Sequence, residues 1–196
     1  MTQPLFESKT LQTGQLYYLK EDNKSSLRIN FSTRREDDNP PKEYKDEYIF
    51  DGTWLTRIDY QVKEVKRYQQ APEGKSVDAF DLISERFPIV GFSSVEKLEE
   101  QFNIQLIKPE SDKSTNLVQL HLETKPDSSY KDDYKSVDLW IDTSLDLPAK
   151  IVAVNTEQDI YQIDFLKPVV NKKIDKKVFE YKIPKGFTEE IERLEE

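Results

Sequence analysis

The feature that most constrains the fold of this chain is an alternation of apolar and polar side chains with a period of two residues. In residues 26–34, Leu27, Ile29 and Phe31 point to one side, and polar residues point to the other. Such spacing is typical of a strand with one buried face. The same pattern recurs in 44–51, 53–60, 63–70, 116–124, 136–142, 150–156 and 159–166. Since few helical segments interrupt it, the pattern predicts an antiparallel meander of about nine to eleven strands in one domain, residues 1–196.

The turns and helices that interrupt this pattern are also readable. Asp51 and Gly52 predict a tight hairpin turn, because glycine accepts a positive φ. Residues 77–87 carry apolar side chains at helical spacing and end before Pro88, and Ser93 with Glu96 forms a capping box that opens a second helix. The acidic segment 188–195 predicts a frayed helix, with a docking tail for a basic partner as the alternative.

Composition excludes several classes of function. The chain has no cysteine and one histidine, so zinc, iron–sulfur and copper sites and cysteine nucleophiles lack their usual residues, and a serine triad would need His121. The five glycines lie too far apart for a phosphate-binding loop. A net charge of −9 opposes nucleic-acid binding, and no apolar run is long enough to span a membrane. Residues 1–10 lack signal-peptide features, so we expect either a cytosolic protein or a mature chain whose leader was removed.

A long antiparallel sheet must bury one face, and here only two short helices and an apolar connector, residues 87–92, are available to cover it. A curled sheet with these helices over its mouth would enclose a space suited to an apolar ligand. The same side chains would equally serve as an ordinary core, and the pattern alone does not separate the two readings.

Four segments, in order, carry a resemblance to a known family. They are TGQLYYLKEDNKSSLRINF (13–31), IFDGTWLTRIDYQVKEVKRY (49–68), VDLWIDTSLDLPAKIVAVN (137–155) and VFEYKIPKGF (178–187). Together they resemble the LolA-like family of bacterial outer-membrane lipoprotein carriers. The family's first helix is absent or trimmed. No Arg-Pro pair like that of the best-known carriers lies near residues 20–25, where Arg28 and Arg34 are the nearby arginines.

The resemblance implies a mainly β fold, in which a large antiparallel sheet curls into an unclosed half-barrel with short lid helices inserted mid-chain. It implies a monomeric periplasmic carrier that holds the acyl chains of lipoproteins, or another lipid, in an apolar cavity. An inner-membrane release complex and an outer-membrane acceptor would be its partners. No catalysis, cofactor, metal or nucleic acid is expected. The alternative is a lipid-binding sensor or a protein-interaction module of the same fold, with a filled interior.

We expect two groups of residues to line the cavity. The sheet side comprises Ile29, Phe31, Trp54 and Ile58, and the lid side comprises Phe80, Ile83, Phe87, Ile89 and Phe92. For each of them, ordinary core packing is the alternative.

Other polar residues favour structural roles. His121 lies opposite the apolar side chains of its segment and is expected to be a solvated or hydrogen-bonded strand histidine rather than a catalytic base. Asp127, Asp132 and Asp133 lack the order and the glycine of a calcium loop, so we interpret them as a charged turn.

Overall fold

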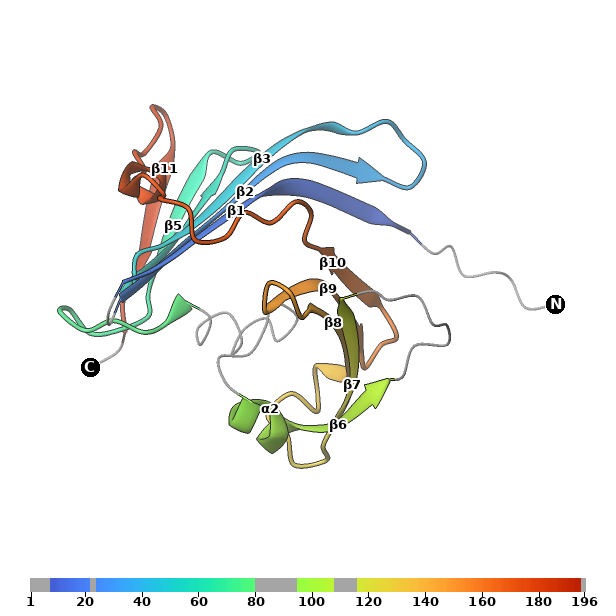
Figure 1. Ribbon diagram of the computed structural model, residues 1–196. Coiled ribbons are helices and arrows are strands. Elements are labelled where there is room, and N and C mark those ends of the chain that lie inside the picture. The colour runs from blue at the N-terminus through green and yellow to red at the C-terminus, as the bar shows by residue number, and fades with distance from the viewer. Residues whose placement is uncertain (1–7, 22–23, 80–94, 108–115, 195–196) are drawn as a thin grey trace. The chain divides into compact units, whose positions relative to one another are not determined.

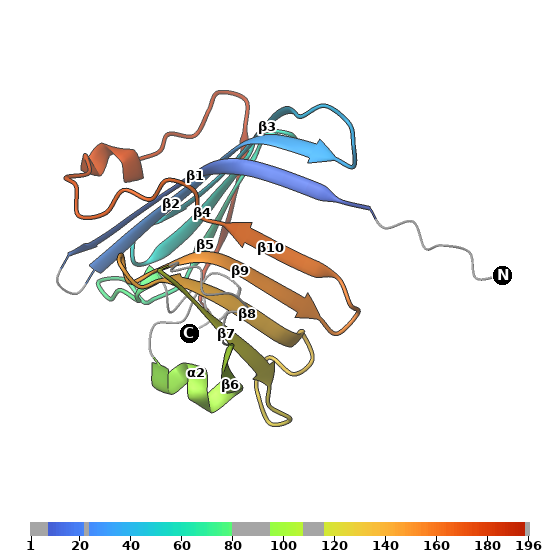
Figure 2. The same cartoon turned by 45° about the vertical axis from the view of Figure 1, so that its right-hand side comes forward.

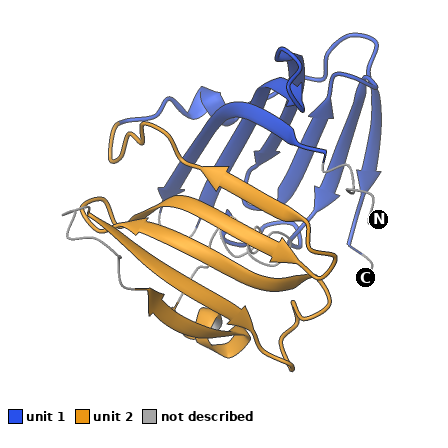
Figure 3. Ribbon diagram, turned by 90° about the vertical axis from the view of Figure 1, so that its right-hand side faces the viewer, with its two compact units in different colours: residues 1–79, 173–196 blue, residues 80–172 orange. Residues whose placement is uncertain are grey.

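The computed structural model describes residues 8–21, 24–79, 95–107 and 116–194. Its chain forms two compact units, of which one combines residues 1–79 with 173–196 and the other comprises 80–172 (Figure 3). Each unit is built around its own sheet. The chain is mainly β, as the alternation predicts, and neither sheet closes into a barrel within the described residues.

The first unit contains a six-stranded sheet with the strand order β1-β2-β3-β4-β5-β11 (Figure 1). Its strands are β1 (Thr10–Glu21), β2 (Lys24–Glu36), β3 (Lys42–Phe50), β4 (Trp54–Asp59), β5 (Glu64–Gln69) and β11 (Thr188–Glu192). The first five pair antiparallel, as predicted, whereas β11 pairs parallel with β5. A short 3₁₀ helix, η2 (Lys176–Phe179), precedes β11.

The second unit contains an antiparallel five-stranded sheet with the order β10-β9-β8-β7-β6 (Figure 2). Its elements are α2 (Val95–Gln101), β6 (Phe102–Ile107), β7 (Leu117–Thr124), β8 (Tyr134–Asp142), β9 (Leu147–Asn155) and β10 (Ile160–Asp164). Leu98 and Phe102 pack on buried residues of β7, β8 and β9 to form the core of this unit. Alternation therefore identified the buried side of this sheet correctly.

The turn at Asp51 and Gly52 forms as predicted. Gly52 has a φ of +98°, and the Asp51 carboxylate accepts hydrogen bonds from the N–H groups of Thr53 and Trp54 at 2.9 and 2.8 Å. Phe50 consequently pairs with Leu55, so Trp54 projects from the opposite face of the sheet.

The two mid-chain helices and the final segment have different outcomes. Helix α2 begins at Val95 and confirms the second predicted helix, whereas Ser93 of the predicted capping box lies outside the described residues. Of the predicted helix 77–87, only residues 77–79 belong to the described chain. The predicted helix 188–195 is wrong: residues 188–192 form the strand β11, because their backbone pairs with β5 and the carboxylates of Glu189 and Glu190 meet Arg67 and Lys66.

Among the described helices, none is long and apolar enough to cross a membrane.

Candidate functional site

The register of the six-stranded sheet divides the predicted sheet-side residues between its two faces. Ile29 pairs with Tyr48, and Phe31 pairs with Asp46, so these side chains share one face. Ile58 lies opposite Glu47, and Glu47 lies opposite Asn30, the neighbour of Ile29. The side chains of Ile58 and Trp54 therefore project from the other face of the sheet. We name the two sides the Ile29 face and the Ile58 face. The apolar residues of the Ile29 face are Leu16, Tyr18, Leu27, Ile29, Phe31, Tyr48, Phe50, Leu55 and Tyr68.

Over β3, β4 and β5, the Ile58 face is a filled core. Ile49, Ile58 and Val65 are 2%, 1% and 0% exposed, and Tyr181 and Phe187 pack against them. Both aromatic residues belong to residues 173–187, which we call the C-terminal strap. Trp54 is also buried on this face, with the guanidinium groups of Arg67 and Arg193 over its ring at 4.7 and 5.7 Å.

Arg28 holds the C-terminal strap to the sheet. Its Nη1 donates hydrogen bonds to the carbonyl oxygens of Val178 and Glu180 at 2.8 and 3.0 Å. Its Nη2 forms an ion pair with Glu47 at 2.6 Å, and both side chains are largely buried. This arginine therefore has a structural role on the Ile58 face.

The Ile29 face has a different character, because much of its apolar surface is only half-buried. Ile29, Phe31 and Tyr48 are of intermediate exposure, and Leu16 on the neighbouring strand is 43% exposed. The rings of Phe31 and Tyr48 meet edge to face, with centroids 6.3 Å apart. Such a row of partly exposed aromatic and aliphatic side chains is suited to an apolar ligand.

One end of the Ile29 face is closed by residues 71–79. The Ala79 N–H donates to the Ser25 hydroxyl at 2.6 Å, and the Val77 N–H donates to the carbonyl of Gly52 at 2.9 Å. Leu27 and Phe50 are fully buried at this end. The predicted lid residues Phe80, Ile83, Phe87, Ile89 and Phe92 follow Ala79 directly in sequence, and they lie outside the described residues.

An ion pair with a buried carboxylate interrupts the apolar row, and its arginine, Arg57, is 35% exposed. Asp46 is 3% exposed, and Arg57 donates to its two carboxylate oxygens at 3.2 and 2.9 Å. The hydroxyls of Tyr44 and Tyr48 also donate to Asp46, at 3.3 and 3.4 Å. The hydrogen bonds to Asp46 raise the pKa of Arg57, and burial, reinforced by the Asp46 charge, raises the pKa of Tyr48 to about 12. Because both pKa values are raised, Arg57 stays charged and Tyr48 stays neutral at neutral pH.

Sequence reasoning missed this ion pair, although a signal was present. Asp46 lies between Tyr44 and Tyr48 at the period of the aromatic row, so it shares their face. A buried carboxylate in such a row needs a cation nearby, and the register of the hairpin at Gly52 puts Arg57 opposite Tyr48 and diagonal to Asp46 on the same face.

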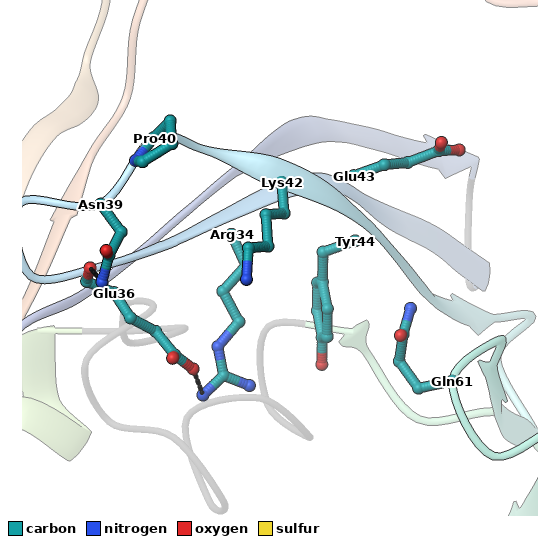
Figure 4. Close-up of a pocket in the computed structure, with 8 residues that line it drawn as sticks. All are labelled: Arg34, Glu36, Asn39, Pro40, Lys42, Glu43, Tyr44 and Gln61. Carbon is teal, nitrogen blue, oxygen red and sulfur yellow. Dashed lines mark hydrogen bonds and ion pairs between the residues drawn. The ribbon is translucent and has the colours of Figure 1, made fainter.

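Beyond Tyr44, the Ile29 face ends in a pocket of about 270 Å³ (Figure 4). The side chains of Arg34, Lys42 and Tyr44 point to the same side of the sheet there, and the Gln61 side chain extends toward them from the segment between β4 and β5. Arg34 Nη2 pairs with Glu36 at 3.0 Å, and its guanidinium carbon lies 5.7 Å from the centre of the Tyr44 ring.

The remaining polar candidates are placed as follows. His121 Nδ1 lies 3.0 Å from the Asp138 carboxylate, on the face of its sheet opposite the buried Leu122. A strand histidine with a hydrogen-bond partner agrees with the expectation for this residue. Across the part of the chain that is described, no three histidine, aspartate or glutamate side chains gather as metal ligands would.

Comparisons with known proteins support the fold. No protein-family model matches the chain, and no curated protein matches its sequence. The solved structure of MucB matches with a TM-score of 0.51 and 9% sequence identity, over 87% of this chain and 52% of MucB. The fold is LolA-like. The resemblance inferred from the four segments is thus confirmed at the level of fold.

Two further solved structures match the chain at lower similarity. A domain from Vibrio parahaemolyticus described as an outer membrane lipoprotein-sorting protein matches with a TM-score of 0.38 and 16% identity, over 82% of this chain and 66% of that domain. A chain from the complex of the Clostridioides difficile CwlD amidase with the GerS lipoprotein matches with a TM-score of 0.40 and 8% identity, over 84% and 86% of the two chains. The present chain spans about half the length of the MucB chain it matches.

Proposed function

We propose that this protein is a carrier that binds the acyl chains of a lipoprotein, or of another lipid, on the Ile29 face of its six-stranded sheet. The observation that carries this proposal is the contrast between the two faces of one sheet. On the Ile58 face the C-terminal strap completes the core, whereas on the Ile29 face Leu16, Ile29 and Phe31 keep part of their apolar surface accessible. The LolA-like fold supports the same reading.

The energetics suit a reversible carrier. Each buried methylene contributes roughly 0.8 kcal/mol, so a stretch of about ten methylenes gains about 8 kcal/mol before the entropy of immobilisation is subtracted. The net affinity is then moderate, which allows release to an acceptor. In this proposal the protein binds and transfers its ligand without catalysing a reaction, works in the periplasm, and exchanges its ligand with an inner-membrane release complex and an outer-membrane acceptor.

A protein-interaction module of the same fold is the second candidate. It is favoured by the ion pair of Asp46 and Arg57, which occupies part of the Ile29 face with internal polar contacts. A structure described as a complex of Pseudomonas aeruginosa MucA with MucB gives a precedent for protein binding by a similar chain. This candidate predicts that no lipid binds the Ile29 face.

Two leucines of β1 give a matched test of the carrier proposal. Leu16 and Leu11 are 43% and 42% exposed, and they lie on the Ile29 face and the Ile58 face respectively. Because both are exposed, neither Leu16→Asn nor Leu11→Asn should unfold the protein. In a titration with a fluorescent fatty acid, we expect Leu16→Asn to weaken binding about ten-fold, since it removes roughly 1.5 kcal/mol of apolar contact. Leu11→Asn should bind like the wild type.

Native mass spectrometry of the purified protein provides a second readout, in which bound lipid should appear as a mass increment. Absence of fatty-acid binding to the wild-type protein would contradict the carrier proposal and favour the interaction module. Equal weakening by the two leucine variants would show that the Ile29 face is not the binding surface.

A further inference from the structure

The pocket at the end of the Ile29 face continues the apolar row. Lys42 and Tyr44 precede Tyr48 on β3 at the same period of two residues, so all three project from the Ile29 face. In the register of the sheet, Arg34 on β2 lies opposite Lys42 on β3. The guanidinium group of Arg34 lies over the ring of Tyr44. Along one face, the surface therefore changes from apolar at Phe31 to basic at Arg34.

The two cations of the pocket have binding capacity left. Arg34 carries five N–H donors. Its Nη2 pairs with Glu36, while its Nε has no hydrogen-bond partner among the described residues. Lys42 forms no ion pair with any residue in the described part of the chain. Tyr44 and Gln61 add polar groups to the wall of the pocket (Figure 4).

Local charge sets this pocket apart from the molecule as a whole. The chain carries a net charge of −9, which repels anions from most of its surface. In the pocket, Arg34 and Lys42 outweigh Glu36, while the Glu43 side chain points away from the other pocket side chains (Figure 4). Arginine presents a planar fork of donors that fits the oxygens of a phosphate or a carboxylate. An anionic group is therefore the ligand that this pocket favours.

We propose that the ligand is an anionic amphiphile, whose phosphate or carboxylate lies between Arg34 and Lys42 while its hydrocarbon tail extends over Phe31 and Ile29. This inference rests on the proposed carrier function and defines the class of lipid. At about 3.3 Å per residue, the open part of the row, from Lys42 to Tyr48, is about 20 Å long. One leaflet of bilayer hydrocarbon is about 15 Å thick, so the row accommodates a headgroup and a complete acyl chain.

The test uses two probes with the same tail. Dodecyl phosphate and dodecyl maltoside, each below its critical micelle concentration, are titrated by calorimetry into the wild type, Arg34→Gln and Lys42→Gln. Arg35→Gln serves as the control, because Arg35 is adjacent in sequence but projects from the Ile58 face. Inorganic phosphate is titrated separately to test for a site that needs no tail. The ion pair of Arg34 and Glu36 is exposed, so its loss should leave the fold intact.

We expect the wild type and Arg35→Gln to bind dodecyl phosphate about ten-fold more tightly than dodecyl maltoside, since a charge-assisted hydrogen bond contributes on the order of this factor. Arg34→Gln and Lys42→Gln should remove most of that difference, and added salt should reduce it. Equal affinities for the two probes in the wild type would overturn the headgroup site and leave the carrier function supported. Binding of inorganic phosphate without binding of either dodecyl probe would overturn both the amphiphile and the carrier. Binding of none of these three probes would also overturn both proposals.

Discussion

At the scale of single residues, the Asp46–Arg57 pair has a large consequence for stability. Asp46 is buried in a row of aromatic side chains, where an unpaired charge is strongly unfavourable. Arg57 neutralises it through two hydrogen bonds and also pairs with Asp59 at 3.0 Å. The pair therefore allows the Ile29 face to include the Asp46 carboxylate while the sheet stays folded.

Arg57→Gln should destabilise the protein by about 3 kcal/mol, because it leaves the Asp46 carboxylate buried without a cation. Urea denaturation followed by tryptophan fluorescence measures the change. Arg34→Gln is the control, since it breaks an exposed ion pair and should change the free energy of unfolding by less than about 1 kcal/mol. Similar losses in the two variants would mean that Asp46 does not depend on Arg57.

At the scale of elements, the C-terminal strap decides which face of the six-stranded sheet becomes core. Tyr60 and Phe187 meet edge to face at 5.2 Å, and β11 then pairs with β5. Arg28 connects the strap to β2 through the carbonyls of Val178 and Glu180. The core of the Ile58 face is covered as a result, and the Ile29 face is the one on which we propose that a ligand binds.

We predict that Arg28→Gln loosens the strap. Glu47 would lose its close, buried partner, and the protein should lose about 3 kcal/mol of stability. Hydrogen exchange read by mass spectrometry should become faster in residues 173–187. Lys176→Gln is a suitable control, because Lys176 also belongs to the C-terminal strap and its ion pair with Glu21 of β1 is exposed. Unchanged exchange in Arg28→Gln would refute this role of Arg28.

The sequence predicted which segments form strands better than it predicted how the strands pair. Alternation within a strand separates Ile29 from Arg28 and Ile58 from Arg57, and both separations are confirmed. Placing Ile29 and Ile58 on opposite faces requires the register across three strands, which alternation within one strand does not contain. The acidic end was mistaken for a helix because glutamate favours helices, whereas its partners on β5 lie more than a hundred residues earlier.

At the scale of the whole molecule, the carrier proposal requires a cover for the Ile29 face. The expected cover comprises Phe80, Ile83, Phe87, Ile89 and Phe92, which follow the closed end of that face in sequence. The spacing of these residues is the basis for the expectation, and their role in binding stays a prediction.

Phe87→Asp should weaken the binding of a hydrophobic dye about ten-fold, because a charge replaces an apolar contact with the ligand. A fluorescence titration measures this affinity. Val62→Asp provides the control, since Val62 is 66% exposed in the turn between β4 and β5. Unchanged dye binding in Phe87→Asp would argue against the lid assignment.

The discontinuous makeup of the first unit affects the order in which the protein can fold. Its strands β1 to β5 leave the ribosome early, but the segment that covers the Ile58 face and supplies β11 is synthesised only after the whole of residues 80–172. Until then, Ile49, Ile58 and Val65 have no Tyr181 or Phe187 to pack against. The nascent chain therefore passes through a stage in which the apolar side chains of this face are exposed to solvent, and a chaperone would be most useful during that interval.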